Sequence, residues 1–395
     1  MKVFVKGLNS CINRKRDITR YREFAKRSGH TVVDHADDSD VVLLWTCAFR
    51  QDRHDHSIEQ IKDLTQAGKE VVVCGCLPDI NQASLDAVFK GHVIRWKDER
   101  KGLVEYFGGR TEDLDELDLV LGEKPLDHEP EEFKRQNPDL KVVYTDNFVK
   151  IFVSEGCSYK CTYCAERLAF PAYRSFPIEY LVAETRRRIS NSENERIVLW
   201  ADSLGDYGRD IGSSLPELVR RLMKEFPNIR IGLEHLHPAN FIEYFPELVE
   251  LVSSGVVWLL DLPIQSAADR VLKLMGRQYT KSDIERIFST LNEIGFRELE
   301  THAIVGFPGE TEDEFQETVD FLVRHKPKYI LLSGYMEAPS ASARNLSGQI
   351  ASNEIRRRVI SASEHISKAG IICNYDNSEL SQERFQKDFL DLSAY

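Results

Sequence analysis

Three cysteines in the middle of the chain, Cys157, Cys161 and Cys164, have the spacing C-x3-C-x2-C. No histidine or fourth cysteine follows them closely. A structural zinc site uses four protein ligands, whereas a cubane iron–sulfur cluster held by only three thiolates keeps one iron open for another molecule. The spacing therefore favours a 4Fe-4S cluster with a chemical role. A partial zinc knuckle and three buried thiols without a metal are the alternatives.

A second group of three cysteines lies in the N-terminal part of the chain, and each member follows an apolar run typical of a strand. Cys11 follows residues 2–6, Cys47 follows 40–45 and Cys76 follows 70–74. The loops after the strands of a parallel α/β sheet gather along one edge, so these distant cysteines are expected to meet at a second metal site. The alternative is that each packs as a small buried hydrophobic residue.

Alternating strand-like and helical runs predict the elements that position both groups. In residues 1–105 the strands alternate with helical segments at 17–28 and 57–67, which indicates a parallel sheet. From residue 142 onward six strands are expected at 147–154, 196–200, 228–233, 256–262, 298–305 and 329–333. Helices are expected between them at 178–189, 214–226, 245–254, 282–294 and 312–324. Six such units predict an open partial (βα)6 barrel, whose chemistry collects on the loops after the strands.

Composition limits the environment and the partners of the chain. Its 395 residues are 42% hydrophobic, and no run approaches 18 apolar residues, so we expect no membrane association and a cytoplasmic location. Eight cysteines in such a chain are typical of thiolate ligands in a reducing compartment. The formal net charge of −12 disfavours a large nucleic-acid substrate unless a local basic patch overrides it.

The C-x3-C-x2-C motif, with Tyr163 before its last cysteine, resembles that of the radical S-adenosylmethionine (SAM) enzymes. Within that superfamily the chain is most similar to the methylthiotransferase branch, from residue 1 to about residue 345. The resemblance implies a flavodoxin-like N-terminal domain whose three cysteines hold an auxiliary 4Fe-4S cluster. Ser10-Cys11-Ile12-Asn13, Trp45-Thr46-Cys47 and Gly75-Cys76 are similar to the three motifs of that domain. Trp45 departs from the family pattern, which usually has Asn at this position.

The resemblance also implies which residues contact SAM. Asp202, after the second strand of the barrel, is the candidate for the methionine amino group, and a helix N-cap is the alternative role. Arg277 is the candidate for the carboxylate, and Glu234 for the ribose. The remaining candidates lie in family-like segments near the cluster loop and after later strands: Tyr163, Gln265, Gly306, Pro308 and Gly309. No catalytic side chain is assigned beyond the cluster ligands.

Other residues are expected to be structural. Cys74 and Cys373 lie in apolar runs and are expected in cores. The segment Arg53-His54-Asp55-His56 is expected to be a solvated polar face rather than a metal site. His235 and His237 could line the pocket after the third barrel strand, and the His-Pro pair there is expected to be structural.

The predicted organisation is an N-terminal α/β domain at 1–105, an acidic linker at 106–141, a partial barrel at 142–345 and a helical extension at 346–395. Members of the family commonly end in a small β-barrel called the TRAM domain. The last 50 residues show no alternating short strands, so we expect this domain to be absent.

The function that the resemblance implies is sulfur insertion. SAM is cleaved to a 5'-deoxyadenosyl radical, which takes hydrogen from an unactivated C–H, and sulfur from the auxiliary cluster then forms a C–S bond. Methylation of that sulfur by a second SAM would give a methylthioether, and without methylation the product would be a thiol or a thioether ring. A flavodoxin or ferredoxin would supply electrons. The acidic charge and the missing TRAM domain favour a small-molecule or peptide substrate over RNA. The alternatives are a tRNA or ribosomal-protein methylthiotransferase without its own TRAM domain, and a non-catalytic redox protein with two clusters.

Overall fold

The computed structural model describes residues 1–8, 12–120, 148–190 and 196–376. The N-terminal lobe is built on a five-stranded sheet with the order β2-β1-β3-β4-β5, all of whose pairings are parallel. This is the strand order of flavodoxin-like folds, as expected. The strands are β1 Lys2–Gly7, β2 Thr31–Val32, β3 Val41–Thr46, β4 Val71–Gly75 and β5 His92–Val93.

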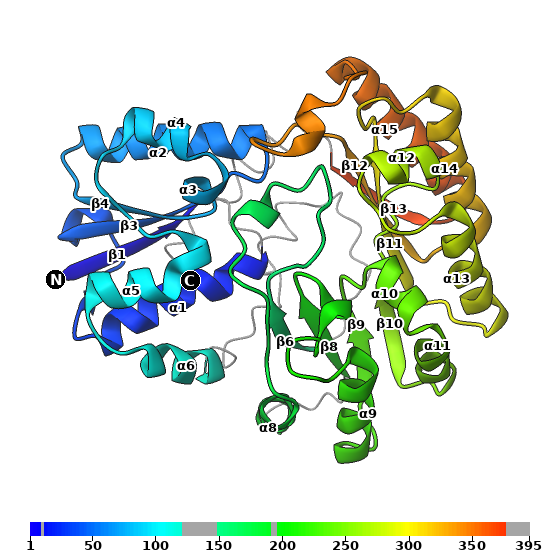
Figure 1. Ribbon diagram of the computed structural model, residues 1–395, viewed down its shortest axis with the longest axis horizontal. Helices are drawn as coiled ribbons and strands as arrows, with labels where there is room; N and C mark the ends of the chain where they lie inside the picture. Colours follow the sequence, from blue (N-terminus) through cyan, green and yellow to red (C-terminus); the bar gives the residue numbers. More distant parts are fainter. Residues whose placement is uncertain (9–11, 121–147, 191–195, 377–395) are drawn as a thin grey trace.

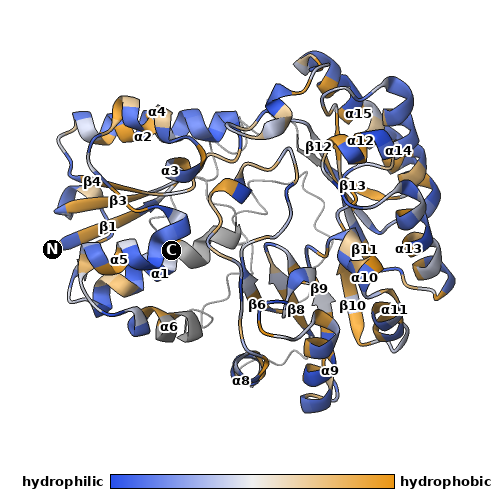
Figure 2. Cartoon of the chain, in the orientation of Figure 1, coloured by the Kyte–Doolittle hydropathy of each residue, from blue (hydrophilic) through white to orange (hydrophobic). Residues whose placement is uncertain are grey.

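Helices cover both faces of this sheet. Helices α2 (Gln51–Gln66), α3 (Leu77–Ile80) and α4 (Gln82–Val88) lie on one face, and α1 (Ile12–Arg27) and α5 (Glu99–Phe107) lie on the other (Figure 1). Every residue of β3 and β4 is buried, because both faces of a parallel sheet are covered. Figure 2 shows the resulting apolar strands between helices with hydrophilic outer faces.

The acidic segment after residue 105 begins as ordered structure rather than as a solvated connector. Residues Thr111–Val120 form helix α6, which packs against α1. Its Leu114 and Leu117 are buried in the N-terminal core, whereas Glu112 in its first turn is exposed, as in an amphipathic helix. Residues 121–141 of the predicted linker lie outside the described residues.

The second lobe contains an eight-stranded sheet with the order β13-β12-β11-β10-β9-β8-β6-β7. The six predicted strands are β6 Val149–Glu155, β8 Arg196–Ala201, β9 Arg230–Leu233, β10 Val257–Asp261, β11 Leu299–Val305 and β12 Tyr329–Gly334. The short strand β7 (Arg174–Ser175) pairs antiparallel with β6, and the other pairings are parallel. The outer helices are α8 Ile178–Ile189, α9 Leu215–Glu225, α10 Pro238–Glu243, α11 Phe245–Ser253, α12 Asp269–Leu274, α13 Lys281–Glu293 and α14 Glu312–His325.

The segment after the sixth barrel strand contains a helix, as expected, and also a strand that was not expected. Helix α15 (Ser352–Lys368) leads into strand β13 (Ile372–Asp376), which pairs in parallel with β12. These residues therefore add a seventh parallel strand to the sheet. The short run Ile371-Ile372-Cys373 gave too little periodicity to predict it. Residues 377–395 lie outside the described residues, and no statement about a further domain follows.

The two lobes share a buried boundary. Ala165 and Ala169, just after the C-x3-C-x2-C loop, belong to the core of the N-terminal lobe, as do Ala338 and Ala341 after β12. Phe170 stacks edge-on against Trp96, with ring centroids 5.4 Å apart. The barrel opening therefore faces the loops that follow the N-terminal strands (Figure 1). No helix in the described ranges is long and apolar enough to cross a membrane.

Candidate cluster and SAM site

The loop that carries Cys157, Cys161 and Cys164 leaves the end of β6 through a sharp turn. Gly156 has a φ of +82°, a conformation that a residue with a side chain rarely adopts. Its backbone N–H donates to Asp202 Oδ2 at 3.1 Å, so the loop after β8 holds the start of the cysteine loop. Asp202 therefore lies beside the predicted cluster. Its predicted role toward the SAM amino group remains a prediction.

Asp206 also holds this loop, although no sequence pattern singles it out. Its side chain is fully buried, and its Oδ2 accepts hydrogen bonds from the Ser158 hydroxyl at 2.6 Å and the Ser203 hydroxyl at 2.9 Å. Asn240 Nδ2 donates to its other oxygen at 3.3 Å. A buried carboxylate needs such donors, so Asp206 fixes Ser158 next to Cys157.

A stacked pair of rings supports the other side of the loop. Tyr159 lies parallel to His237, with centroids 3.7 Å apart, and its hydroxyl donates to Asn240 Oδ1 at 2.9 Å. His237 also caps α10, because its Nδ1 accepts from the backbone N–H of Ala239 at 3.1 Å. Burial lowers the pKa of His237 to about 2, so the ring is neutral. The structural role expected for this His-Pro pair agrees with these contacts.

Arg277 lies against the cysteine loop and not on an exposed helix. Its Nη1 is 3.7 Å from Cys161 Sγ, and its Nη2 donates to the carbonyl of Pro263 at 3.0 Å. The guanidinium also lies over the rings of Tyr163 and Tyr279, at 5.8 and 5.7 Å from their centroids. Its buried Nε has no hydrogen-bond partner in the described part of the chain. A positive group with an unused donor beside a candidate cluster ligand fits the carboxylate of SAM.

The loops after β8, β9, β10 and β11 lie at one rim of the sheet, because these strands are consecutive neighbours. Asp202, Glu234, Gln265 and Gly306 follow them in that order. Gln265 is buried with a φ of +65°, and its carbonyl accepts from the backbone N–H of Ile304 at 2.8 Å. The structure thus brings these predicted SAM residues to one edge.

The glycine-rich turn after β11 is covered by the C-terminal part of the lobe. A Cβ at Gly306 would approach a side-chain carbon of Ile355 on α15 to 2.7 Å, so only glycine fits. The backbone N–H of Gly309 donates to the carbonyl of Gly348 at 2.8 Å. Pro308, the residue before Gly309, is buried. The Gly306 N–H donates to Glu310 Oε2 at 2.6 Å, which closes the turn.

A polar cluster lines the inside of the barrel, and the sequence predicted Glu234 as a site residue but not Lys150, Asp261 or His302. Glu234 pairs with Lys150 of β6 at 2.9 Å, and His302 of β11 is 3.4 Å from Asp261. Burial disfavours the charged form of Glu234, but Lys150, His235 and His302 together outweigh burial and lower the pKa of the carboxyl. Burial lowers the pKa of His302 against the opposing charge of Asp261. Polar residues at alternate positions of an apolar strand were the signal for an inward face.

In the N-terminal lobe the structure describes two of the three predicted ligands, Cys47 and Cys76, and Cys11 lies outside the described residues. The backbone N–H of Cys76 donates to the carbonyl of Thr46 at 3.0 Å, so the loops after β3 and β4 touch. Gly75 has a φ of +87°, and a Cβ there would approach that carbonyl oxygen to 2.3 Å. Both cysteines are buried, at 7% and 2% exposure.

The charge of one carboxylate, that of Glu166, acts on a candidate ligand in each cysteine group. Burial raises the pKa of the Cys47 thiol to about 12, and the charge of Glu166 adds to the effect. Burial also raises the pKa of Cys164, and Glu166 again adds to it. Glu166 begins the short 3-10 helix Glu166–Leu168, which contacts helix α3 of the N-terminal lobe. Because α3 starts directly after Cys76, the loops of Cys76 and Cys164 lie close together.

Cysteine thiolates of this kind are the ligands that hold iron–sulfur clusters. Burial raises the pKa of Cys157 to about 12 as well, so a metal must displace the protons of these thiols when it binds. No group of three metal-binding side chains among the described residues could hold a single ion.

Two expectations for other residues have different outcomes. Cys74 and Cys373 are buried in β4 and β13, which confirms their placement in cores. The expectation of a solvated face at Arg53-His54-Asp55-His56 is wrong for Arg53 and His54, which are 6% and 7% exposed on α2. His54 is held by Asp55 at 2.8 Å and Asn81 at 3.3 Å, because α2 turns this side toward the loop before α4.

Comparison with known proteins identifies the class. Residues 151–322 match the radical SAM superfamily, and residues 2–94 match the uncharacterized protein family UPF0004. A protein of Pyrococcus horikoshii is 30% identical over 351 residues, which cover 87% of this chain and 79% of that protein. The chain therefore belongs to the radical SAM methylthiotransferase family and is an enzyme of that family. Membership implies a 4Fe-4S cluster and SAM, and the alternative of a non-catalytic redox protein is set aside.

The relatives carry a more particular name. The Pyrococcus horikoshii protein is named "Probable threonylcarbamoyladenosine tRNA methylthiotransferase". The human threonylcarbamoyladenosine tRNA methylthiotransferase is 28% identical over 340 residues, which cover 80% of this chain and 54% of the human protein. These relatives act on tRNA by name, which supports the tRNA alternative over the expected small-molecule or peptide substrate.

Solved structures support the fold alone. The radical SAM methyltransferase TsrM from Kitasatospora setae matches with a TM-score of 0.60 at 14% identity, over 87% of this chain and 75% of that chain. The cobalamin-dependent radical SAM enzyme OxsB matches with a TM-score of 0.53 at 12% identity, over 99% of this chain and 62% of that chain. Each match covers most of this chain, so the similarity in fold extends over both lobes.

Proposed function

We propose that the chain attaches a methylthio group to threonylcarbamoyladenosine in tRNA, with Cys157, Cys161 and Cys164 holding one 4Fe-4S cluster and Cys11, Cys47 and Cys76 holding the other. The observation that carries the proposal is the contact between helix α3, which directly follows Cys76, and the 3-10 helix Glu166–Leu168, which follows Cys164. A sulfur donor must lie next to the place where the substrate loses hydrogen, so the two sites have to share a chamber. The names of the relatives supply the substrate class.

The residues of the barrel have separate tasks in this proposal. When bound, the barrel cluster supplies the electron that cleaves SAM. Arg277 holds the SAM carboxylate, and Asp202 accepts hydrogen bonds from the amino group. Asp206 and Tyr159 hold the cysteine loop in place. Glu234 lies at the neighbouring strand end and faces the ribose.

The N-terminal lobe provides the second group of thiolates and closes the chamber. The contact between Cys76 and Thr46 keeps two of its loops together, and Phe170 packs the following barrel segment against Trp96. This packing excludes water from the boundary, which protects a radical from side reactions. An electron donor such as flavodoxin or ferredoxin would reduce the clusters from outside.

The test is anaerobic reconstitution of the full chain with iron, sulfide, SAM and dithionite, followed by incubation with tRNA that contains threonylcarbamoyladenosine. We expect the digested tRNA to contain a methylthio derivative of that nucleoside, together with 5'-deoxyadenosine and S-adenosylhomocysteine. Release of 5'-deoxyadenosine without any modified nucleoside would overturn the proposed substrate.

The acidic charge of the chain is the observation that favours a second candidate, a small-molecule or peptide substrate. A polyanionic tRNA meets repulsion from a chain with a net charge of −12 unless basic residues gather at the binding face. Sulfur insertion would then occur at an unactivated C–H of that substrate. The same assay separates the candidates, because the second predicts SAM cleavage that tRNA does not stimulate.

A further inference from the structure

Two exposed lysines lie beside the cysteine loop of the barrel. Lys160 is between Cys157 and Cys161 in the sequence, and Lys273 is on α12. Both side chains are exposed, and neither ammonium group has a hydrogen bond or an ion pair within the part of the chain that the structure describes. The proposed function assigns no task to either lysine.

The cysteine loop packs directly against the C-terminal end of α12. The Oγ1 of Thr162 donates to the carbonyl of Leu274 at 2.8 Å. A Cβ at Gly276 would approach the carbonyl oxygen of Lys160 to 3.1 Å, so the glycine permits the close approach of these two segments. Lys273 directly precedes Leu274, and both lysines therefore lie beside the same contact, close to candidate ligands of the barrel cluster.

The arginines around this loop already have acidic partners, unlike the two lysines. The pairs are Arg209 with Glu243, Arg270 with Glu314, and Arg344 with Glu337. Lys160 and Lys273 therefore supply the uncompensated positive charge at this surface. A chain with a net charge of −12 repels an acidic protein on average, so a local positive charge would direct such a protein to this place.

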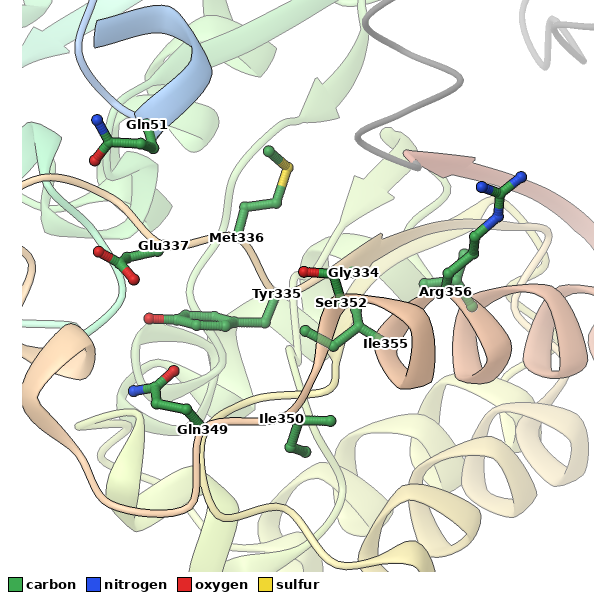
Figure 3. Close-up of a pocket in the computed structure, with 11 residues that line it drawn as sticks. Gln51, Gly334, Tyr335, Met336, Glu337, Gln349, Ile350, Ser352, Ile355 and Arg356 are labelled. Atoms are coloured by element: carbon green, nitrogen blue, oxygen red, sulfur yellow. The ribbon is translucent and has the colours of Figure 1, made fainter. Parts of the chain in front are cut away.

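The later part of the cysteine segment faces the boundary between the lobes instead. Ala165 and Ala169 pack into the core of the N-terminal lobe. A pocket of about 330 Å³ at this boundary is lined by Gln51 of the N-terminal lobe and by Tyr335 and Glu337 after β12, and by neither lysine (Figure 3). The proposed substrate must lie between the two cysteine groups, so this boundary is its side of the segment. The lysines are left for another partner.

We propose that Lys160 and Lys273 form the docking site of an acidic flavodoxin that reduces the barrel cluster. One electron leaves the reduced flavodoxin and enters the cluster, and no further reductant is needed for the cleavage of one SAM. Redox proteins meet through small, transient interfaces, in which a few charges set the rate of encounter. The inference rests on the electron donor named in the proposed function and does not depend on tRNA.

Calorimetric titration of the full apo chain with oxidised flavodoxin at low salt tests the docking site without any cluster. Lys160→Gln/Lys273→Gln should weaken binding about fivefold to tenfold, the effect of losing two exposed charge pairs. The difference should disappear at about 0.5 M salt, because ions screen exposed charges. Lys160→Arg/Lys273→Arg keeps both charges and should bind flavodoxin as the wild type does.

Lys62→Gln/Lys224→Gln is the matched control, because it makes the same change in net charge. Lys62 and Lys224 are also exposed, and in the described ranges neither side chain has a hydrogen bond or an ion pair. They lie towards the C-terminal ends of α2 and α9. A helix that follows a parallel strand runs back from the rim, so both lysines are remote from the cysteine loop. This variant should bind flavodoxin within about twofold of the wild type.

The reconstituted enzyme provides a second measurement. Lys160→Gln/Lys273→Gln should raise, by the same factor as in the titration, the concentration of reduced flavodoxin needed for half-maximal release of 5'-deoxyadenosine. Release driven by dithionite should stay at the wild-type rate, because a small reductant needs no docking site.

Equal flavodoxin binding by Lys160→Gln/Lys273→Gln and by the control would overturn the docking site, and so would a wild type that does not bind flavodoxin at low salt. Weaker tRNA binding with unchanged flavodoxin binding would overturn it as well, since the lysines would then contact RNA. Failure of the proposed function has a different signature. In that case flavodoxin binding still depends on the two lysines, but no tRNA gains a methylthio group.

Discussion

At the scale of single residues, the site depends on charges held in fixed positions. Asp206 accepts from Ser158 next to the first cysteine of the barrel loop, while Asp202 accepts from the N–H of Gly156 just before it. The sequence contained both aspartates after the second barrel strand, and the resemblance directed attention to Asp202. Burial distinguishes them, since Asp206 is fully buried and Asp202 is not. The sequence around the end of one strand does not predict this difference in burial, because it depends on residues from other strands.

Asp206→Asn is predicted to loosen the cluster loop. The new asparagine would place its NH2 group, a donor, among groups that are donors themselves, such as the hydroxyl and backbone N–H of Ser158. At least one hydrogen bond, contributing about 1.5–3 kcal/mol, is therefore lost. We expect the reconstituted variant to hold less iron and sulfide and to cleave SAM more slowly. Asp202→Asn is the comparison: it should keep the wild-type iron content and raise the concentration of SAM needed for half-maximal cleavage. Equal iron content in the Asp206 variant and the wild type would contradict this role.

Glu310 is predicted to make stability depend on pH. Burial raises its pKa to about 7, although the Gly306 N–H and Arg358 oppose the shift. Between pH 4.5 and pH 7 the folded protein keeps a proton that the unfolded chain releases. The free energy of unfolding should therefore fall as pH rises through this range, by on the order of 2–4 kcal/mol.

Urea unfolding of the wild type and of Glu310→Gln at several pH values measures this effect. The glutamine keeps an oxygen for the Gly306 N–H and cannot ionise, so its stability should change less across the same range. A wild type whose stability rises from pH 4.5 to pH 7 relative to the variant would show that the carboxylate is instead stabilised by Arg358.

At the scale of elements, parallel strands bring distant residues to one rim. The apolar runs predicted β1, β3 and β4 and six of the barrel strands to within a few residues. Burial on both faces makes β3 and β4 almost continuously hydrophobic. Strand β13 was missed because it is short and follows a polar helix. The contact of Gly75 with Thr46 was also beyond prediction, since it depends on the register between β3 and β4.

Gly75→Ala is predicted to separate the loops of Cys47 and Cys76. The added Cβ meets the backbone of Thr46, which cannot move aside as a side chain would, and the φ of +87° adds strain. We expect a loss of about 2–4 kcal/mol in stability, together with a lower iron content that leaves SAM cleavage intact.

Gly68→Ala provides the control for backbone strain. Its φ is +74°, and no atom lies within 4 Å of the position of the added Cβ. It should lose stability through the backbone conformation alone and keep the full iron content. If both variants lose the same amount of iron, the contact between the two loops has no special role in holding the cluster.

At the scale of the whole molecule, a buried ion-pair network joins the lobes beside the cysteine loop. Arg20 of α1 donates to Glu99 of α5 and, at 2.7 Å, to Glu155 at the end of β6. Arg174 of β7 also donates to Glu155, at 3.2 Å. Glu155 is two residues before Cys157, so the N-terminal lobe is tied to the start of the barrel loop. Sequence patterns do not reveal the two partners of Arg20, because Glu99 and Glu155 lie far from it along the chain.

The double variant Arg20→Met/Glu99→Gln is predicted to loosen the lobes while keeping the local charge balanced. Leaving one buried charge alone would cost about 3–5 kcal/mol, so both are removed. In calorimetry we expect the single unfolding transition of the apo wild type to split into two. In the reconstituted enzyme, 5'-deoxyadenosine should be released without a matching amount of modified nucleoside.

Arg22→Met, on the same helix, is the control for this prediction, because Arg22 pairs with the exposed Asp34 at 3.3 Å. It should unfold in one transition and keep the wild-type ratio of 5'-deoxyadenosine to product. A double variant that behaves in the same way would show that the apolar boundary at Trp96 and Phe170 holds the lobes together without the ion pairs.

The most direct test of the account compares the two groups of cysteines in one assay with tRNA containing threonylcarbamoyladenosine. Cys47→Ala/Cys76→Ala should still release 5'-deoxyadenosine and should form no methylthio nucleoside, whereas Cys157→Ala/Cys161→Ala should form neither. Cys74→Ala, in the core of the same sheet, should form both. Formation of the methylthio nucleoside at the wild-type rate by Cys47→Ala/Cys76→Ala would contradict the division of labour between the two lobes.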